Sequence, residues 1–492
     1  MALPTANLCI NGVLRPAEGN RTYNNIGPWT GDIIGVAPDA SANDVNEAIA
    51  AARHAFDHSD WSQRHDYRFE LMKRYRDLLY ASRDILVDIA QQEAGATLGA
   101  AAFALVDGAL QGMDGLLECF PRVVWEEDRG VRNGYGFDSH RIIVYEPLGV
   151  VGAITPWNVP LYINIGKVVA ALLAGCTVVL KPAPDTPLTA TYMAELALEA
   201  GVPAGVFNVI TSSDPALAGE ILVADQRVNL ISFTGSTATG KHIMEKSAAT
   251  LKRVFLELGG KSVNIVLEDL PNFAEAIMSS MVVFHAGQGC AVPTRLLVPA
   301  ARYDEAVSLL QMAYAGFADQ WGKYDDPTCV MGPLISARQL ERVKSYIDLG
   351  QAEGARLLAG GNIRSDIHSD MGGGFFIEPT CFVDVTPNMR IAQEEIFGPV
   401  LVVMPFADDD DAVAIANNSD YALGGMVVSA NVERAQAIAR RIHAGAVSVN
   451  GGLSIAGDLP FGGFKGSGMG REWGREGIEE FLDSKVIATR IA

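Results

Sequence analysis

The sequence predicts an α/β protein with more than one domain. Its 492 residues exceed what one hydrophobic core ordinarily holds. Short β-branched runs alternate with Ala- and Leu-rich helical stretches from about residue 140, and a second such series begins after about residue 270. Strands separated by helices of that length must run parallel, because each crossover returns the chain in the same direction. We therefore expect two doubly wound α/β domains, one for each series.

Helical periodicity marks the N-terminal region. Ser41 and Asp44 can cap a helix whose apolar residues recur at helical spacing from Val45 to Phe56. A second amphipathic helix is expected over about 65 to 92. The N-terminal region is therefore expected to open with helices.

The two later series can be followed element by element. In the first, strands are expected within 141–154, 177–182, 205–210, 228–233, 253–258 and 262–267. In the second, strands are expected at 295–299, 400–406, 424–429 and 445–450, with helices over 301–317, 336–353 and 432–443.

Charge and hydropathy limit the partners. The formal net charge of −20 at pH 7 argues against nucleic acid, because the chain shows no cluster of Lys and Arg dense enough to offset it locally. No apolar stretch approaches the ~20 residues that cross a bilayer, and the first residues lack a basic start followed by an apolar core. We therefore expect a soluble cytoplasmic protein with no membrane or nucleic-acid partner.

The sequence predicts neither a metal site nor a disulfide framework. None of the six cysteines pairs at CxxC spacing, and most are expected to be reduced, buried thiols. The acidic run from Asp408 to Asp411 can be interpreted as a metal trap or as a solvated helix start, and the helix start is favoured.

The stretch FTGSTATGKH, residues 233–242, follows an apolar run and begins a helical pattern. Gly235 and Gly240 bracket a turn at a strand end, where the free N–H groups and dipole of the following helix favour an anion. A P-loop needs Ser or Thr after Lys241 to hold Mg²⁺, but His242 stands there. On this stretch alone, dinucleotide binding, nucleoside triphosphate hydrolysis and an ordinary glycine turn all remain open.

Two further stretches carry candidate reactive groups. Cys290 lies between Gly289 and Ala291 in FHAGQGCAVPTR (284–295), and small neighbours leave room for a substrate to reach the sulfur. Glu257 ends an apolar strand in LELGGKS (256–262), where a carboxyl group of raised pKa can act as a base. Taken singly, a buried structural thiol and a structural glutamate are the simpler interpretations.

Together these stretches resemble the NAD(P)-dependent aldehyde dehydrogenase superfamily over nearly the whole chain. The motifs that occur in the family's order are TPWNVP (155–160), KPAPDTP (181–187), FTGSTATG (233–240), LELGGKS (256–262), GQGC (287–290), EEIFGPV (394–400) and PFGGFKGSG (460–468). Each is weak alone, but seven in register are specific. The resemblance favours a pyrophosphate site at FTGSTATG over a P-loop.

The resemblance implies an architecture. A Rossmann-like NAD-binding domain would comprise 1–125 and 148–258, and a catalytic domain would comprise 259–474. A small β oligomerisation arm would comprise 126–147 and 475–492. A homodimer or homotetramer follows by the same analogy.

The resemblance also implies three catalytic residues. Cys290 would be the nucleophile that adds to the aldehyde carbonyl. The side-chain amide of Asn158 and the backbone N–H of Cys290 would bind the resulting oxyanion. After hydride transfer to the nicotinamide, Glu257 would activate the water that hydrolyses the thioester to a carboxylic acid.

The implied cofactor is NAD. Lys181 would bind the adenosine ribose, Ser236 the pyrophosphate, and Glu395 and Phe397 the nicotinamide riboside. The full set of implied cofactor-binding residues is Ile154, Thr155, Pro156, Trp157, Lys181, Pro184, Phe233, Gly235, Ser236, Thr239, Leu258, Gly259, Glu395 and Phe397. A common version of the family's pattern has an acid at the position of Pro184, where it accepts from both ribose hydroxyls. Without that acid NADP remains possible, although NAD is favoured.

The implied substrate pocket contains Val159, Tyr162, Ile163, Gly166, Gly289, Ala291, Leu453, Ile455 and Phe461. Several of these fall where many relatives place larger or aromatic groups, so a roomy apolar tunnel is expected. We interpret the substrate as a hydrophobic aldehyde, namely an aromatic, terpenoid or medium-chain one. His285 replaces the usual Asn of the family. Its role can be simple packing or a titration that matters for function, and both remain open.

Two rival functions remain at this point. A CoA-acylating aldehyde dehydrogenase would pass the thioester to CoA, but that branch often lacks a base equivalent to Glu257. A non-catalytic family member kept for binding would not need the full set of reactive residues that this chain carries.

Overall fold

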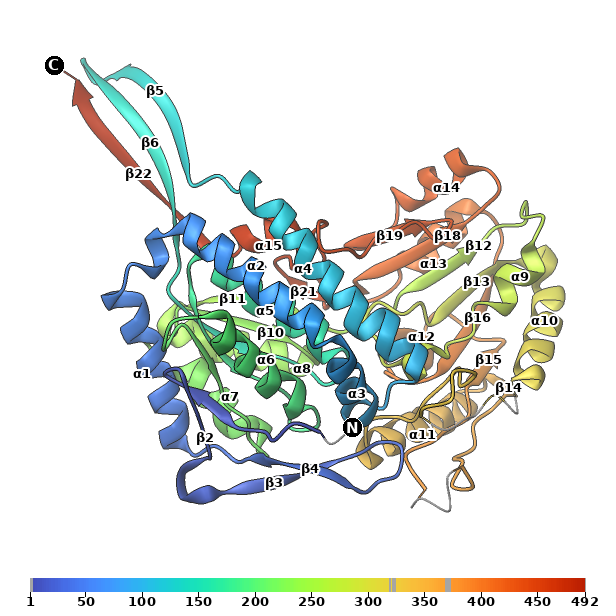
Figure 1. Ribbon diagram of the computed structural model, residues 1–492. Helices are drawn as coiled ribbons and strands as arrows, with labels where there is room; N and C mark the ends of the chain where they lie inside the picture. The colour runs from blue at the N-terminus through green and yellow to red at the C-terminus, as the bar shows by residue number, and fades with distance from the viewer. Residues whose placement is uncertain (1–2, 318–319, 321–323, 368–372, 492) are drawn as a thin grey trace.

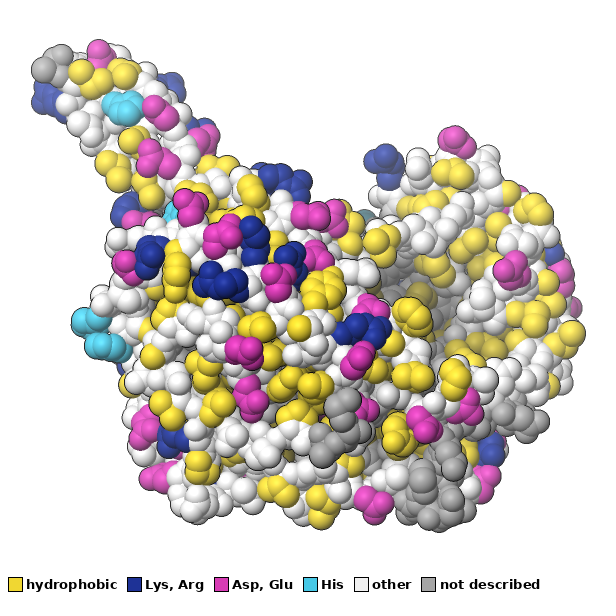
Figure 2. Space-filling view, viewed as in Figure 1, with side chains coloured by type: hydrophobic (Ala, Val, Ile, Leu, Met, Phe, Trp, Pro, Cys, Tyr) yellow, Lys and Arg dark blue, Asp and Glu magenta, His cyan; other side chains and the backbone are white. Residues whose placement is uncertain are grey.

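The computed structural model describes residues 3–317, 320, 324–367 and 373–491. It contains two α/β domains, each built on its own sheet, and a three-stranded arm that projects away from the body (Figure 1). The predicted fold class is therefore confirmed. The space-filling view shows a hollow between the two domains (Figure 2).

The first domain is built on an eight-stranded sheet with the order β2-β1-β9-β8-β7-β10-β11-β21. Its strands are β1 (Leu8–Ile10), β2 (Val13–Arg15), β7 (Val150–Ile154), β8 (Thr177–Lys181), β9 (Phe207–Val209), β10 (Leu230–Thr234), β11 (Arg253–Glu257) and β21 (Gly468–Met469). The run from β9 to β11 is parallel. Strands β8 and β9 follow on one side of β7, whereas β10 and β11 lie on the other. The strand order thus reverses between β7 and β10, and in such sheets ligands bind outside the carboxyl ends of the strands at that point.

Helices cover both faces of this sheet because their connections are crossovers between parallel strands. They are α1 (Ala42–His58), α2 (His65–Ala81), α3 (Arg83–Ala94), the π-helix η3 (Ala100–Asp107), α4 (Gly108–Cys119), α5 (Pro160–Ala174), α6 (Pro187–Ala200), α7 (Pro215–Ala224) and α8 (Thr237–Ser247). Helix α1 begins at the expected capping box, in which Ser41 Oγ accepts from the Asp44 N–H and the Asp44 carboxylate accepts from the Ser41 N–H.

Two expectations about the N-terminal region are wrong. The chain opens with β1, β2 and a hairpin of β3 (Thr22–Ile26) and β4 (Ile33–Pro38), not with helices. Strands of three residues are too short to produce a periodic signal, which explains why β1 and β2 escaped notice. The single helix expected over 65–92 is two helices, α2 and α3, which meet at the non-helical residue Ser82.

The second domain is built on a seven-stranded sheet with the order β14-β15-β16-β13-β12-β18-β19. Its strands are β12 (Val263–Val266), β13 (Arg295–Pro299), β14 (Arg356–Ala359), β15 (Thr380–Val383), β16 (Val400–Phe406), β18 (Gly424–Val428) and β19 (Ala446–Val449). All neighbours pair in parallel except β14, which is antiparallel to β15. Its helices are α9 (Phe273–Met278), α10 (Tyr303–Gly316), α11 (Ala337–Ala352), α12 (Arg390–Gln393), α13 (Asp409–Asn417) and α14 (Val432–Ala439).

The C-terminal segment leaves the second domain and returns to the first. Short strands β17 (Tyr421–Ala422) and β20 (Phe464–Lys465) pair with each other, and β21 then joins the first sheet beside β11. Helix α15 (Gly474–Glu479) packs on α4 and α5. Strand β22 (Leu482–Ile491) pairs with β6 (Phe137–Pro147), which pairs with β5 (Glu126–Gly134), to form the arm.

The remaining sequence expectations concern metals, thiols and membranes. Asp408 caps α13 by accepting from the Asp411 N–H, so the acidic run is a helix start, as favoured. Among the described residues, no group of three or more His, Cys, Asp or Glu side chains is arranged to hold a metal ion. All six cysteines are free, and all but the half-buried Cys290 are buried. Within the part of the chain that is described, no helix has the length and apolarity of a membrane span.

Candidate active site

A cavity of about 460 Å³ lies between the two domains, at the point where the first sheet reverses its strand order. Its walls are formed by Pro156, Trp157, Asn158, Thr234, Gly235, Ser236, Glu257, Leu258, Gly259, Cys290, Arg338, Gln339, Arg342, Glu395 and Phe397. The first domain contributes the segments that follow β7, β10 and β11. The second contributes segments that precede β13 and β16, together with the start of α11. The cavity therefore has one wall from each domain.

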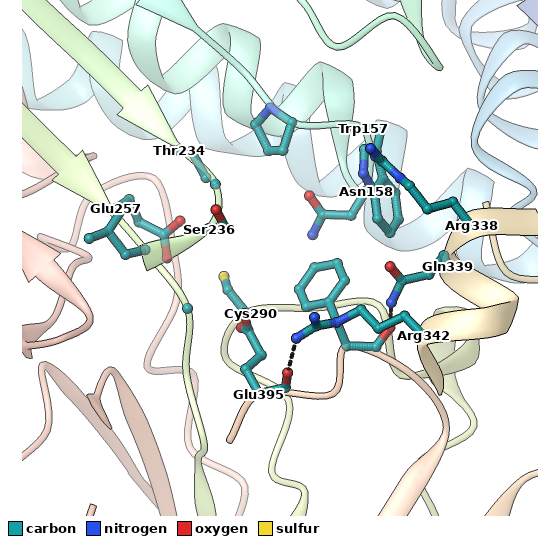
Figure 3. Close-up of a pocket in the computed structure, with 15 residues that line it drawn as sticks. Trp157, Asn158, Thr234, Ser236, Glu257, Cys290, Arg338, Gln339, Arg342 and Glu395 are labelled. Atoms are coloured by element: carbon teal, nitrogen blue, oxygen red, sulfur yellow. Dashed lines mark hydrogen bonds between the residues drawn. The ribbon is translucent and has the colours of Figure 1, made fainter. Parts of the chain in front are cut away.

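The three predicted catalytic residues meet at this cavity. Asn158 and Glu257 are buried, whereas Cys290 is half-buried and remains reachable. Figure 3 shows the amide of Asn158, the carboxyl group of Glu257 and the sulfur of Cys290 directed into the same space. Because the three come from different segments, only the tertiary fold brings them together.

Burial sets the protonation of the reactive pair. Burial, together with the nearby Glu472, raises the pKa of Glu257 to about 8, although Cys290 and Lys167 oppose the rise. Burial and the neighbouring Glu257 carboxyl group raise the pKa of the Cys290 thiol well above its usual value. At neutral pH the pair therefore rests as a thiol beside a largely protonated carboxyl group.

A buried ion pair lies behind Glu257. Lys167 Nζ on α5 is 2.5 Å from Glu472 Oε1 and donates to Ser232 Oγ at 3.1 Å. Its ammonium group also lies 4.7 Å from the ring centroid of Phe255. Both charged groups are fully withdrawn from solvent, so removing either partner would leave an unpaired buried charge. This pair was not predicted.

The FTGSTATG turn has the features of a phosphate site. Ser236 caps α8, because its Oγ accepts from the Thr239 N–H at 3.2 Å. Gly235 makes a close approach to Phe233, since a Cβ at Gly235 would lie 2.5 Å from that ring. The first turn of α8 thus presents N–H groups and a positive dipole end at the cavity edge, which suits the diphosphate of a dinucleotide.

A carboxyl group is held in another part of the cavity wall, beside Gly259 and Gly260. The Gly260 N–H donates to Glu395 Oε1 at 2.9 Å, and a Cβ at Gly259 would lie 2.6 Å from Glu395 Oε2. Gln339 and Arg342 fix the backbone of this segment by donating to the carbonyls of Phe397 and Glu395. The rings of Trp157 and Phe397 pack edge to face, with centroids 5.4 Å apart. A fixed carboxylate with aromatic neighbours suits a ribose hydroxyl pair and a flat ring.

Six predicted cofactor residues do not line this cavity. Ile154, Thr155, Lys181 and Phe233 are buried, Thr239 is exposed on α8, and Pro184 lies elsewhere. Burial lowers the pKa of Lys181 to about 8, and its ammonium group donates to the Pro182 carbonyl at 3.3 Å. Thr155 Oγ1 is buried and has no hydrogen-bond partner among the described residues. A buried ammonium and an orphaned hydroxyl beside the sheet's switch point fit a polar ligand that bears a ribose.

Pro184 lines a neighbouring hollow together with Asp185, Ser213 and Arg338. Arg338 reaches both spaces, because it also lines the main cavity, where Figure 3 shows it at the start of α11. The sequence offered no basic group here besides Lys181, so Arg338 is a cation that was missed.

The nine predicted substrate residues do not line this cavity. Tyr162, Val159 and Ala291 pack against the core of the first domain, and Ile163 and Phe461 are buried. Leu453 and Ile455 lie at the surface with 79% and 37% exposure. Gly289 precedes Cys290 and would meet the Val292 side chain if it carried a Cβ.

The expectation of free space at Gly166 is wrong. A Cβ there would lie 3.0 Å from the indole of Trp473. The same indole occupies the space beside Gly112, where a Cβ would lie 2.8 Å from the ring. Trp473 is fully buried and packs on Tyr162 with ring centroids 4.3 Å apart. The missing side chain of one segment is thus replaced by a large one from a distant segment.

Sequence reasoning missed four lining residues, namely Thr234, Arg338, Gln339 and Arg342. Three of them lie on the first turns of α11, where Ser336 caps the helix by accepting from the Gln339 N–H. The cap was a readable signal, but nothing local indicates that this helix start faces β7 and β10.

Comparison with known proteins agrees with this geometry. The sequence profile of the aldehyde dehydrogenase family matches residues 14–487. A 3-succinoylsemialdehyde-pyridine dehydrogenase of a Pseudomonas species is 39% identical over 477 residues, which cover 96% of this chain and 96% of that protein.

Solved structures are equally similar. A point mutant of betaine aldehyde dehydrogenase from Staphylococcus aureus, in complex with NAD⁺, has a TM-score of 0.93 at 34% identity over 99% of this chain and 97% of that one. A mutant of aldehyde dehydrogenase C from Pseudomonas syringae, in complex with NAD⁺ and octanal, has a TM-score of 0.91 at 36% identity over 98% and 96%. The chain belongs to the aldehyde dehydrogenase family.

Proposed function

We propose that this chain oxidises an apolar aldehyde to the carboxylic acid with NAD⁺, through a thioester on Cys290. One observation carries the proposal: a thiol, a carboxyl group of raised pKa and a buried amide converge on one cavity at the sheet's switch point.

In the first stage the Cys290 thiol gives its proton to water in the cavity, and the sulfur forms a C–S bond to the carbonyl carbon. The carbonyl oxygen becomes an oxyanion, which the amide of Asn158 and the N–H of Cys290 stabilise, each donor by about 3 kcal/mol of barrier. Bound NAD⁺ supplies the hydride acceptor for the hydrogen on that carbon. The C=O bond re-forms as the hydride leaves, and a thioester remains on Cys290.

In the second stage Glu257 acts as the base. Its ionised carboxylate takes a proton from water, and the resulting hydroxide adds to the thioester carbon. The C–S bond then breaks, which releases the carboxylic acid. The sulfur of Cys290 takes the proton back from Glu257 and becomes a thiol again. Glu257 favours hydrolysis over acyl transfer to CoA, because it supplies the base that water needs.

The cofactor assignment rests on this chain's own residues. The α8 N-terminus would hold the diphosphate, Glu395 the nicotinamide ribose, and Lys181 the adenosine ribose. The relatives in complex with NAD⁺ support NAD. Proline at position 184 removes a carboxylate that would repel a 2′-phosphate, so NADP is an alternative acceptor.

The proposed substrate is aromatic, terpenoid or medium-chain. Val159 and Tyr162 follow Asn158 at the start of α5 and pack against the apolar core of the first domain, next to the cavity but not in its wall. The relative from Pseudomonas syringae was solved with octanal, a medium-chain aldehyde.

We also propose a homodimer or homotetramer. The arm leaves Val131, Val486 and Ile487 exposed far from the body of the molecule, and a second copy would cover them. Light scattering coupled to size-exclusion chromatography tests this directly.

The experiment that tests the function is an aldehyde panel with NAD⁺ or NADP⁺, followed by the absorbance of the reduced nicotinamide. The wild type should form NADH with apolar aldehydes, and Cys290→Ala should form none while still binding NAD⁺. NADH formation by a pure Cys290→Ala protein would contradict the proposal.

A further inference from the structure

The turn that leads to Cys290 has an unusual backbone. His285 (φ 45°, ψ 38°) and Ala286 (φ 50°, ψ 34°) are left-handed, and Gly287 also has a positive φ of 70°. For a residue with a Cβ this conformation costs about 1–2 kcal/mol. Such strain persists only where surrounding contacts over-determine the conformation, so the contacts of this turn indicate what it is built to hold.

Gln288 fixes the turn from the side of the second domain. Its side-chain amide donates to the carbonyls of His285 at 3.1 Å and Pro333 at 3.3 Å, and its Oε1 accepts from the Ile335 N–H at 2.9 Å. A Cβ at Gly287 would lie 2.2 Å from the Gly398 carbonyl oxygen, so that position accepts only glycine. These contacts account for the shape of the turn but not for the choice of histidine.

His285 reaches toward the first domain. Its Nε2 lies 2.7 Å from the backbone carbonyl oxygen of Asn158, and its side chain is buried. Because a carbonyl only accepts, Nε2 must carry the proton. Burial lowers the pKa of His285 to about 4, so the ring is neutral at physiological pH. Nδ1 is buried and has no hydrogen-bond partner among the described residues, so within that part of the chain the ring is hydrogen-bonded through Nε2 to Asn158 alone.

Asn158 in turn donates a hydrogen bond to the segment that contains His285. Its side-chain Nδ2 donates to the backbone carbonyl of Gln288 at 3.0 Å. Asn158 is therefore tied at two points to the segment that ends in Cys290, once through its main chain and once through its side chain. One amide hydrogen is used on Gln288, and the second remains for another acceptor.

We infer that His285 is a positioning residue that sets the place of Asn158 relative to Cys290. This inference rests on the proposed function, in which the free amide hydrogen of Asn158 binds the oxyanion that forms from the substrate's carbonyl oxygen. Two hydrogen bonds, one donated by His285 and one donated by Asn158, tie the amide donor to the segment of the nucleophile, although the two segments come from different domains. Loss of the His285 bond frees the Asn158 backbone, and misplacement by about 1 Å costs on the order of a hundredfold in rate.

A purely packing role for His285 predicts something different. Any side chain of similar volume would then serve, whether or not it donates. His285→Gln retains an N–H donor at a reach close to that of Nε2, whereas His285→Leu has a comparable volume and no donor. The two variants are therefore a matched pair.

The test measures kcat and KM with an aldehyde that the wild type oxidises, together with NAD⁺ affinity by calorimetry. His285→Gln should keep kcat within about threefold of wild type, and His285→Leu should lower kcat at least about tenfold with an NAD⁺ affinity changed less than about twofold. In an Asn158→Ala background, His285→Leu should add less than about twofold, because both changes then remove one function.

Three results would overturn the inference. A Leu variant that is as active as the Gln variant, with both near the wild type, shows that volume alone matters. A folded Gln variant as slow as the Leu variant, or as slow as Asn158→Ala if the Leu variant does not fold, shows that the donor does not help. An undiminished effect of His285→Leu in the Asn158→Ala background shows that His285 does not act through Asn158. In each case an active wild type leaves the proposed function standing, whereas a wild type that forms no NADH from any aldehyde overturns both.

Discussion

Turnover limited by thioester hydrolysis should rise about tenfold between pH 7 and pH 9. The base form of Glu257 is required for that step, and burial raises its pKa to about 8. Because the pKa is raised, the carboxyl group keeps its proton up to about that pH and loses it above. About one tenth of the molecules carry the carboxylate at pH 7 and about nine tenths at pH 9.

Stopped-flow absorbance of NADH measures this prediction. A burst of about one equivalent per site identifies hydrolysis as the slow step, and the steady-state rate after the burst gives its pH dependence. Glu257→Gln should retain a burst but lose the pH-dependent rise. A post-burst rate in the wild type that is flat above pH 6, or that levels off near the ordinary pKa of a glutamate, would refute the assignment of Glu257 as a base with a raised pKa.

Four further outcomes are expected. Glu472→Gln should move the inflection of the post-burst pH profile to lower pH, because the Glu472 carboxylate helps to raise the pKa of Glu257; an unchanged inflection would show that burial alone sets it. Arg338→Met should weaken NAD⁺ binding about two- to fivefold in calorimetry and reduce its salt dependence, as for one exposed ion pair, whereas unchanged binding would place Arg338 outside the cofactor site. Trp473→Ala should lower the free energy of unfolding in urea by about 3–5 kcal/mol, because a fully buried indole is lost; a change below about 1 kcal/mol would contradict its packing between α4 and α5. Octanal should be oxidised with a kcat/KM at least about tenfold above that of succinic semialdehyde, whose charged end would lose hydration, and comparable values would refute an apolar site.

Much of the site was readable because its key residues lie in short continuous stretches. Cys290 sits in a run of small residues, Glu257 ends an apolar strand, and Asn158 follows another. Each stretch carries its local chemistry in consecutive letters, and the parallel-sheet pattern implies that strand ends meet at one edge. The sheets and most of the helices followed from the same periodicity.

The rest depends on pairs of residues far apart in the chain. Nothing near Gly166 indicates that Trp473 fills its space, and nothing near Lys167 indicates its partner Glu472. From the sequence, Arg338 is an ordinary exposed helix residue. Only the packing of α11 in the fold brings it to the cavity. A single sequence records periodicity within a segment, but it holds no record of which segments touch.

Strained backbone was equally hidden. The left-handed conformation of His285 runs against its intrinsic preference, and Trp473 adopts φ 63° and ψ 173°, which a bulky residue rarely does. Propensity predicts neither, because the surrounding contacts impose both.

Mass spectrometry of the Glu257→Gln protein, after mixing with octanal and NAD⁺, detects the thioester on Cys290 itself. Without its base the acyl enzyme should accumulate, so we expect a gain of one octanoyl group on the peptide that contains Cys290, in step with the first equivalent of NADH. NADH formation with the acyl group on another side chain, or with no adduct at all, would contradict a thioester on Cys290.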